Sequence, residues 1–109
     1  MRQAVMIEPG KIEMGEAEEP VAGPGQVRIR IQRIGVCGSD IHVFHGEHPF
    51  VTYPLIQGHE YAGVVDELGE GVTGIKLGDK VTATPQEVCG RCPPCERGQY
   101  NACEELKVR

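Results

Sequence analysis

The sequence lacks a cluster of basic residues and a long apolar run. Sixteen acidic residues against eleven basic ones argue against a nucleic-acid partner, because affinity for a phosphate backbone comes from clustered Lys and Arg. No apolar run approaches the roughly 20 residues of a membrane-spanning helix, and no basic amphipathic helix is visible. We therefore expect neither nucleic acid nor a membrane among its partners.

No positively charged start is followed by an apolar stretch, so we expect no secretory leader. We expect a cytoplasmic protein, in which cysteines serve as metal ligands rather than as disulfides. No Gly-x-Gly-x-x-Gly segment lies between a strand and a helix. We therefore expect residues 1–109 to contain no dinucleotide-binding (Rossmann) domain.

Four of the five cysteines form one cluster near the end of the sequence, with the spacing Cys-x2-Cys-x2-Cys-x7-Cys. They are Cys89, Cys92, Cys95 and Cys103. Four thiolates in one short, turn-rich segment suit a structural zinc ion, which accepts four sulfur ligands in tetrahedral geometry. We predict a zinc-binding lobe over residues 85–105.

Two other uses of these four cysteines stay open on the sequence alone. Four cysteines allow three pairings into two disulfides. The Cys-x2-Cys-x2-Cys start also occurs in ferredoxin-type iron–sulfur sites, whose fourth cysteine follows after three residues and precedes a proline. Here the last gap is seven residues and Glu104 follows, so zinc is the favoured interpretation.

The fifth cysteine, Cys37, belongs to a second cluster of polar residues. His59 and Glu60 follow it in the sequence, and thiolate, imidazole and carboxylate are ligands of open catalytic zinc sites. Ser39 and His42 add a hydroxyl and another imidazole close to Cys37. A lone cysteine is more often a small buried apolar residue, so the hypothesis of a metal site depends on the whole cluster.

The first third of the sequence predicts β-structure. Residues 2–7 and 12–18 flank Pro9-Gly10-Lys11, which indicates a hairpin. Residues 27–32 alternate apolar and polar side chains, as a strand with one buried face does. The alternation slips at Arg33-Ile34, where we expect a bulge or bend just before Cys37.

Further strands are expected at residues 61–68 and 81–84. The only predicted helix runs from Ser39 to His45, and Gly46 ends it. The loop that follows contains Phe50, which we expect to pack under the loop rather than to line a substrate pocket. The sequence thus predicts a mainly β domain with one short helix.

The two clusters resemble, in order and spacing, the N-terminal part of the zinc-dependent medium-chain alcohol dehydrogenases. The matching segments are Gly35-x-Cys37-Gly38-Ser39-Asp40-x-His42, Gly58-His59-Glu60, Gly78-Asp79-Lys80-Val81 and the four-cysteine segment. Gly38 and the Ser39-Asp40 pair are more similar to the polyol and sorbitol dehydrogenase branch than to the liver-type enzymes. The implied fold over residues 1–109 is a partly open β-barrel similar to the co-chaperonin GroES.

The resemblance also implies roles for the residues of the second cluster. Cys37 and His59 would ligate the catalytic zinc, with Glu60 as a direct or exchanging ligand. Ser39 would bind the substrate hydroxyl and begin a proton relay that His42 continues to solvent. Asp40 would accept a hydrogen bond from His59 and fix its tautomer. The carboxylate of Asp40 also suits a helix start, which Ser39 could cap.

The implied activity is oxidation of a secondary alcohol or sugar alcohol to a ketone, through a zinc alkoxide and hydride transfer to NAD or NADP. The implied partners are a small alcohol or polyol and, at full length, further copies in a tetramer or dimer. Because the nucleotide-binding domain is absent, we expect a fragment that is inactive alone. The alternatives are a zinc-stabilised GroES-like module that acts in assembly or binding, and a metal-free relative of quinone reductases. Cys37, His59 and the lobe argue against the second.

Overall fold

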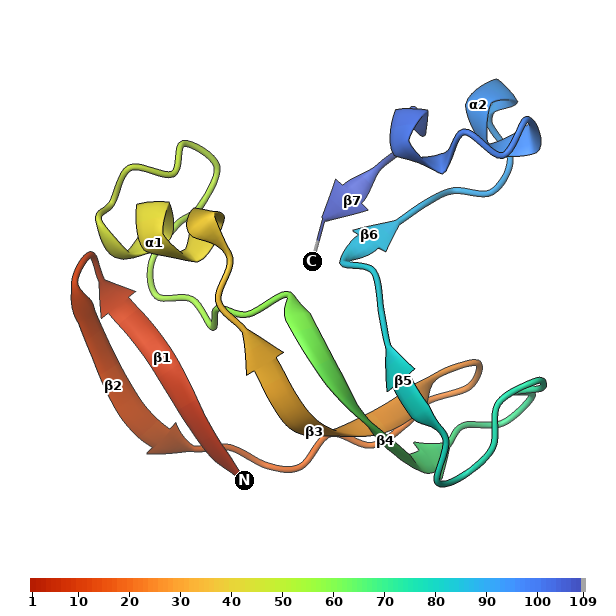
Figure 1. Ribbon diagram of the computed structural model, residues 1–109, viewed down its shortest axis with the longest axis horizontal. Helices are drawn as coiled ribbons and strands as arrows, with labels where there is room; N and C mark the ends of the chain where they lie inside the picture. The colour runs from red at the N-terminus through yellow and green to blue at the C-terminus, as the bar shows by residue number, and fades with distance from the viewer. Residues whose placement is uncertain (109) are drawn as a thin grey trace.

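The computed structural model describes residues 1–108 and consists mainly of antiparallel β-structure in small open sheets (Figure 1). In the described residues β1 pairs with β2, β3–β4–β5 form a three-stranded sheet, and β6 pairs with β7. The strands are β1 (Arg2–Glu8), β2 (Lys11–Glu16), β3 (Val27–Gly35), β4 (Glu60–Leu68), β5 (Lys80–Thr82), β6 (Gln86–Glu87) and β7 (Lys107–Val108). The mainly β prediction is confirmed, and the sheets do not close into a barrel.

The β1–β2 hairpin forms where the sequence predicts it. Gly10 in its turn has a φ of 77°, a left-handed conformation that glycine adopts at little cost. Met6 of β1 is only 2% exposed, and its backbone exchanges two hydrogen bonds of 2.9 and 3.0 Å with Leu55. These bonds tie the hairpin to the long loop that leads to β4.

Strands β3 and β4 pair antiparallel along their length and end with Gly35 opposite Glu60. The register shifts twice, and the second shift lies between Ile31 and Arg33. The bulge expected before Cys37 is therefore present, slightly earlier in the strand than the alternation indicated. A bulge of this kind lets β3 bend shortly before the chain enters the helix at Gly38.

Helix α1 (Gly38–Phe44) confirms the predicted helix, with Cys37 as its N-cap residue. Asp40 at the third helical position accepts a 2.9 Å hydrogen bond from the backbone N–H of Cys37. The expectation that Ser39 caps the helix is wrong, because Ser39 lies inside the first turn and Asp40 already serves the free N–H group. Gly46, with a φ of 75°, follows the last turn as expected.

The lobe contains two short helices that the sequence analysis did not expect, α2 (Pro93–Glu96) and the 3₁₀ helix η1 (Tyr100–Ala102). The fixed φ of Pro93 suits the first helical position, so Pro93 begins helix α2. The two-residue strands β6 and β7 join the lobe to the rest of the domain, and β5 ends at Thr82, earlier than expected.

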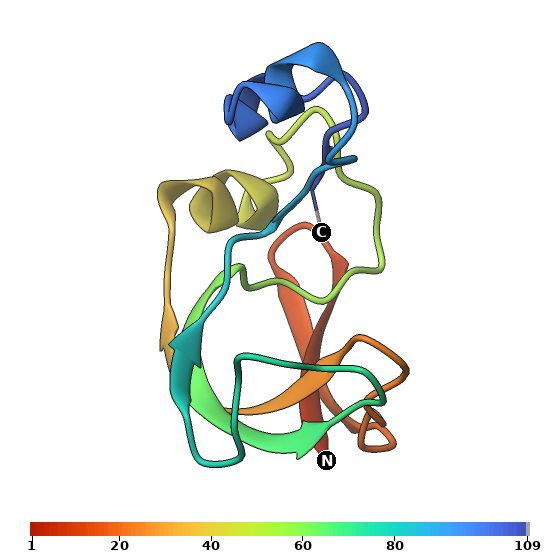
Figure 2. The same cartoon turned by 90° about the vertical axis from the view of Figure 1, so that its right-hand side faces the viewer.

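The packing of the chain is loose for its length. The radius of gyration is 16.0 Å, whereas a compact chain of 100 residues has about 13 Å, and the extents are 40 × 33 × 20 Å (Figure 2). In the described residues the buried apolar side chains are Met6, Val43, Val65 and three lobe cysteines. Apolar side chains such as Ile34, which is 69% exposed, face solvent on the sheets.

None of the helices in residues 1–108 has both the length and the apolar character needed to cross a membrane.

The hairpin offers a matched pair of methionines for testing this small core. We expect Met6→Ala to lower the free energy of unfolding by about 3 kcal/mol, because it empties a fully buried site. Met14, on the partner strand, is 68% exposed, so Met14→Ala should change stability by less than about 0.5 kcal/mol. Denaturant unfolding followed by circular dichroism measures both, and equal losses would contradict the assigned core.

Candidate metal centres

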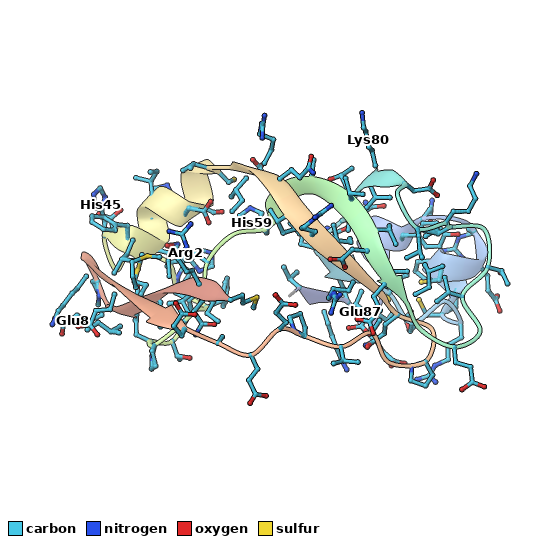
Figure 3. The ribbon with its side chains drawn as sticks, turned by 90° about the horizontal axis from the view of Figure 1, so that it is seen from below. Arg2, Glu8, His45, His59, Lys80 and Glu87 are labelled. Carbon is cyan, nitrogen blue, oxygen red and sulfur yellow. The ribbon has the colours of Figure 1, made fainter. Side chains whose placement is uncertain are left out.

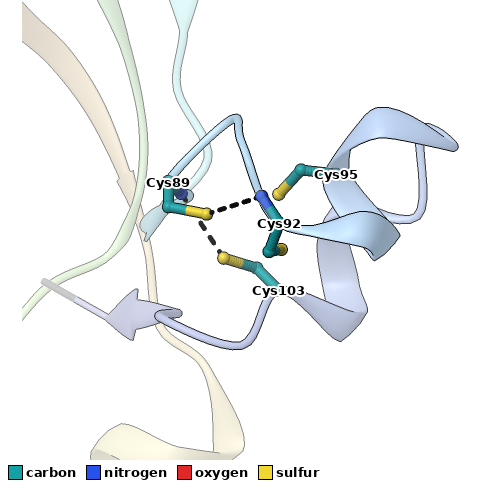
Figure 4. Close-up of side chains that lie close together, drawn as sticks. All are labelled: Cys89, Cys92, Cys95 and Cys103. Carbon is teal, nitrogen blue, oxygen red and sulfur yellow. Dashed lines mark hydrogen bonds between the residues drawn. The ribbon is translucent and has the colours of Figure 1, made fainter.

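The lobe brings its four cysteine sulfur atoms together (Figure 4). The Sγ atoms of Cys89, Cys92, Cys95 and Cys103 all lie within 4.8 Å of one another. A tetrahedral zinc ion with bonds of about 2.3 Å has sulfur–sulfur edges of about 3.8 Å, so a small contraction of this set would enclose one ion. All five cysteines of the chain are free thiols in the structure, and the four-thiol set fits zinc.

Backbone N–H groups donate hydrogen bonds to two of the lobe sulfur atoms, and such bonds favour the thiolate form that binds a metal cation. The N–H of Cys92 donates to Cys89 Sγ and the N–H of Cys89 donates to Cys103 Sγ, each at 3.4 Å (Figure 4). The backbone N–H groups of Arg91 and then Cys92 lower the pKa of Cys89 to about 7. Burial, by contrast, raises the pKa of Cys95 to about 12. Metal binding therefore has to displace a tightly held proton from Cys95.

The second cluster forms where β3 ends and β4 begins. One ligand atom each of Cys37, His59 and Glu60 lies within 4.8 Å of the others. The pairing of Gly35 with Glu60 brings these strand ends together. Cys37 lies just after β3, and His59 lies just before β4 (Figure 3). Residues that are far apart in the sequence thus lie close together, and their donor set suits an open zinc site.

Asp40 links the helix start to this cluster. Its Oδ1 lies 3.5 Å from Nδ1 of His59, while its Oδ2 accepts the backbone N–H of Cys37. An imidazole whose Nδ1 faces a carboxylate is free to present Nε2 to a metal, and the role of Asp40 in fixing the tautomer of His59 stays a prediction. Gln57, which the sequence analysis missed, donates from Nε2 to the backbone oxygen of Asp40 at 3.2 Å.

Hydrogen bonding shifts the pKa values of Cys37 and His59 in opposite directions. The hydroxyl and the backbone N–H of Ser39 donate to the Cys37 sulfur, followed by His59, and these bonds lower the pKa of Cys37. The bond to Cys37 is also the main reason that the pKa of His59 is raised, with the carboxylates of Asp40 and Glu60 adding to it. The Cys37 thiol therefore loses its proton more easily when a metal cation binds.

A pocket of about 600 Å³ opens beside the second cluster. Ser39, Asp40 and His59 form its polar end, and its walls include Val43, Leu55 and Ile56. Phe50 also lines this pocket and is 88% exposed, so the expectation that it packs under the loop is wrong. His48 from the same loop and Val108 of β7 complete the rim, and neither was predicted to be there.

His42 lies apart from this pocket. Its side chain is 65% exposed, and its Nδ1 lies 3.2 Å from Oε2 of Glu47. The sequence analysis grouped His42 with Cys37 and Ser39, but the described structure turns its ring toward Glu47, just beyond the end of helix α1. Its role in a proton relay stays a prediction.

The sequence and fold of the chain are similar to those of known dehydrogenases. Residues 23–108 match the family model of the alcohol dehydrogenase GroES-like domain. A sorbitol dehydrogenase from Halalkalibacterium halodurans is 46% identical over 99 residues, which are 90% of this chain and 29% of that protein.

Two solved structures share the fold at similar identity. An alcohol dehydrogenase (rspB) from Escherichia coli, complexed with NADH, has a TM-score of 0.87 and 37% identity, covering 100% of this chain and 32% of that one. A cobalt- and zinc-bound thermostable alcohol dehydrogenase from Pyrobaculum aerophilum has a TM-score of 0.85 and 41% identity, covering 96% and 32%. The chain thus spans about a third of the length of these relatives.

The order in which the lobe thiols lose their protons can be tested in the metal-free chain. Cys89 should react with iodoacetamide with a midpoint near pH 7, because only its thiolate is nucleophilic. Labelling should fall as the pH drops below that midpoint, while Cys95 should stay unlabelled until far higher pH. Peptide mass spectrometry over a pH series measures both, and equal labelling of the two cysteines at pH 7 would contradict the assignment.

Proposed function

Because this chain belongs to the zinc-dependent medium-chain alcohol dehydrogenase family, in its polyol branch, we propose that it forms the N-terminal part of the catalytic domain of an NAD(P)-dependent alcohol or polyol dehydrogenase. The observation that carries the proposal is the meeting of Cys37, His59 and Glu60, of which His59 lines a pocket together with Ser39. The substrate is a secondary alcohol or sugar alcohol, which the enzyme oxidises to a ketone. A segment outside residues 1–109 supplies the nucleotide-binding domain.

Two metal centres follow from the two clusters. Cys37 and His59, with Glu60, hold the catalytic zinc, and the four cysteines of the lobe, within residues 85–105, hold the structural one. When bound, zinc supplies a Lewis acid and the nicotinamide supplies a hydride acceptor. A module that acted only in assembly would need neither the open ligand set nor the polar pocket end.

Ser39 receives the proton of the substrate hydroxyl in this proposal. Its hydroxyl lies against the Cys37 sulfur and lines the pocket, so a substrate oxygen beside the metal position is within its reach. A serine hydroxyl cannot hold an extra proton at neutral pH, so Ser39 would accept the substrate proton while it passes its own hydroxyl proton on toward solvent. His42, exposed and next to Glu47, exchanges protons with bulk water and is the candidate for the last step.

Asp40 acts through His59. With one carboxylate oxygen near Nδ1 of His59 and the other on the backbone of Cys37, it fixes both ligand-bearing segments relative to each other. Such partners of a ligating histidine typically contribute 10–100-fold to metal affinity or activity.

The pocket fits a small molecule. Its polar end lies at the metal position, and its walls include apolar side chains. A substrate would therefore place its reacting hydroxyl at the polar end and its carbon skeleton against the walls. We further propose that the full-length protein acts in the cytoplasm as a homo-oligomer, a tetramer or dimer, as its resemblance to the polyol branch implies.

Metal content tests the two centres directly. We expect about two zinc ions per chain by elemental analysis, one at each cluster of the structure. Cys37→Ala should lose one and keep the other, because it removes the thiolate of the open site only. Val36→Ala is the matched control, since Val36 is 75% exposed next to Cys37, and it should keep both ions. Iron in place of zinc, or a full complement in Cys37→Ala, would sink the assignment.

Activity of the full-length protein tests the role of Ser39. Ser39→Ala should lower kcat for polyol oxidation by about 100-fold, the lower end of what general acid–base groups contribute. Ser39→Thr keeps the hydroxyl and should retain most of the rate. The absorbance of the reduced nicotinamide measures turnover. Equal rates for Ser39→Ala and the unmodified protein would rule out the relay.

A further inference from the structure

We propose that Gly35 is a positioning residue, whose missing side chain lets the Glu60 carboxylate reach the metal position formed with Cys37 and His59. The inference rests on the catalytic metal centre proposed above. Its basis is the close approach of two residues that face each other at the end of a strand pair, Gly35 on β3 and Glu60 on β4.

Directly opposed residues of an antiparallel pair project to the same face, with Cβ atoms about 4.5–5.5 Å apart. A Cβ atom placed on Gly35 would lie 2.8 Å from Oε2 of Glu60 and 3.1 Å from its Cβ. Both distances are shorter than an ordinary van der Waals contact, which for two carbon atoms is about 3.5–4.0 Å, so the Glu60 side chain would have to move by at least a few tenths of an ångström. The Glu60 side chain thus occupies the space that a side chain at position 35 would need.

Apart from its electrostatic interactions with Cys37 and His59, nothing in the described residues holds the Glu60 carboxylate in place. It is exposed and makes no hydrogen bond or ion pair with another of the described residues. Its approach to Cys37 and His59 therefore depends on the open space above Gly35. A methyl group there would turn the flexible carboxylate toward solvent, and the backbone would need to shift only by a few tenths of an ångström.

Glycine at this position also has no local advantage. A glycine in a strand loses more conformational freedom on folding than other residues and packs nothing. The φ of Gly35 lies outside the left-handed region, so its backbone conformation is open to any residue. Room for the Glu60 side chain is the physical reason that remains for a glycine here.

Cobalt binding to the chain with a zinc-loaded lobe tests the inference. The visible absorption of Co²⁺ at the second site reports both its affinity and its ligand set. We expect Gly35→Ala to weaken this binding by at least about tenfold and to give the spectrum of Glu60→Ala. Gly15→Ala is the matched control, because Gly15 is also a strand glycine but has no atom within 4 Å of its added Cβ. It should bind cobalt like the unmodified chain.

The double variant separates a positioning role from a structural one. If Gly35 acts only through Glu60, Gly35→Ala combined with Glu60→Ala should bind cobalt no more weakly than Glu60→Ala alone. A further loss in the double variant, unchanged binding in Gly35→Ala, or loss of its β circular dichroism would each overturn the inference. Absence of a second cobalt from the unmodified chain would instead overturn the proposed centre, and the inference with it.

Discussion

The antiparallel register of β3 against β4 is the constraint on which the candidate catalytic site depends. It places Gly35 opposite Glu60, and the ends of both strands then lie side by side. Cys37 and His59 stand just beyond these ends, so the pairing of two backbones brings a thiol, an imidazole and a carboxylate to one point. A slip by one residue would send Glu60 to the other face of the sheet.

The two clusters use the same cysteine chemistry in different surroundings. In the lobe, three of the four sulfurs are buried and the set is complete, which suits an ion that holds a loop together. At Cys37 the set is smaller, partly exposed and open to a pocket, which suits an ion that meets a substrate. Ser39 and Asp40 serve this second set through hydrogen bonds from the first turn of α1.

Local patterns explain what the sequence alone could predict. The hairpin, the longer strands and helix α1 follow from alternation and turn residues, and all are present. The residues of the two predicted ligand clusters lie close together, and their roles as metal ligands stay predictions. The start of α2 was missed because Pro93 fits a stiff loop as well as a first helical turn. The two-residue strands β6 and β7 carry no periodicity to detect. The contact of Gly35 with Glu60 can be predicted only if the β3–β4 register is known. Two register shifts in β3 prevent that register from being found by counting residues along the sequence.

The closeness of the lobe ligands along the chain has a consequence for the order of folding. Cys89 and Cys103 close a short loop, whereas Met6 reaches Leu55 and the Cys37 site needs residues from either side of a long loop. Loop-closure entropy and contact order favour the shorter closure. With metal present, the lobe is therefore expected to be among the first parts of the chain to form, and the catalytic site to be assembled later on the finished β3–β4 pair.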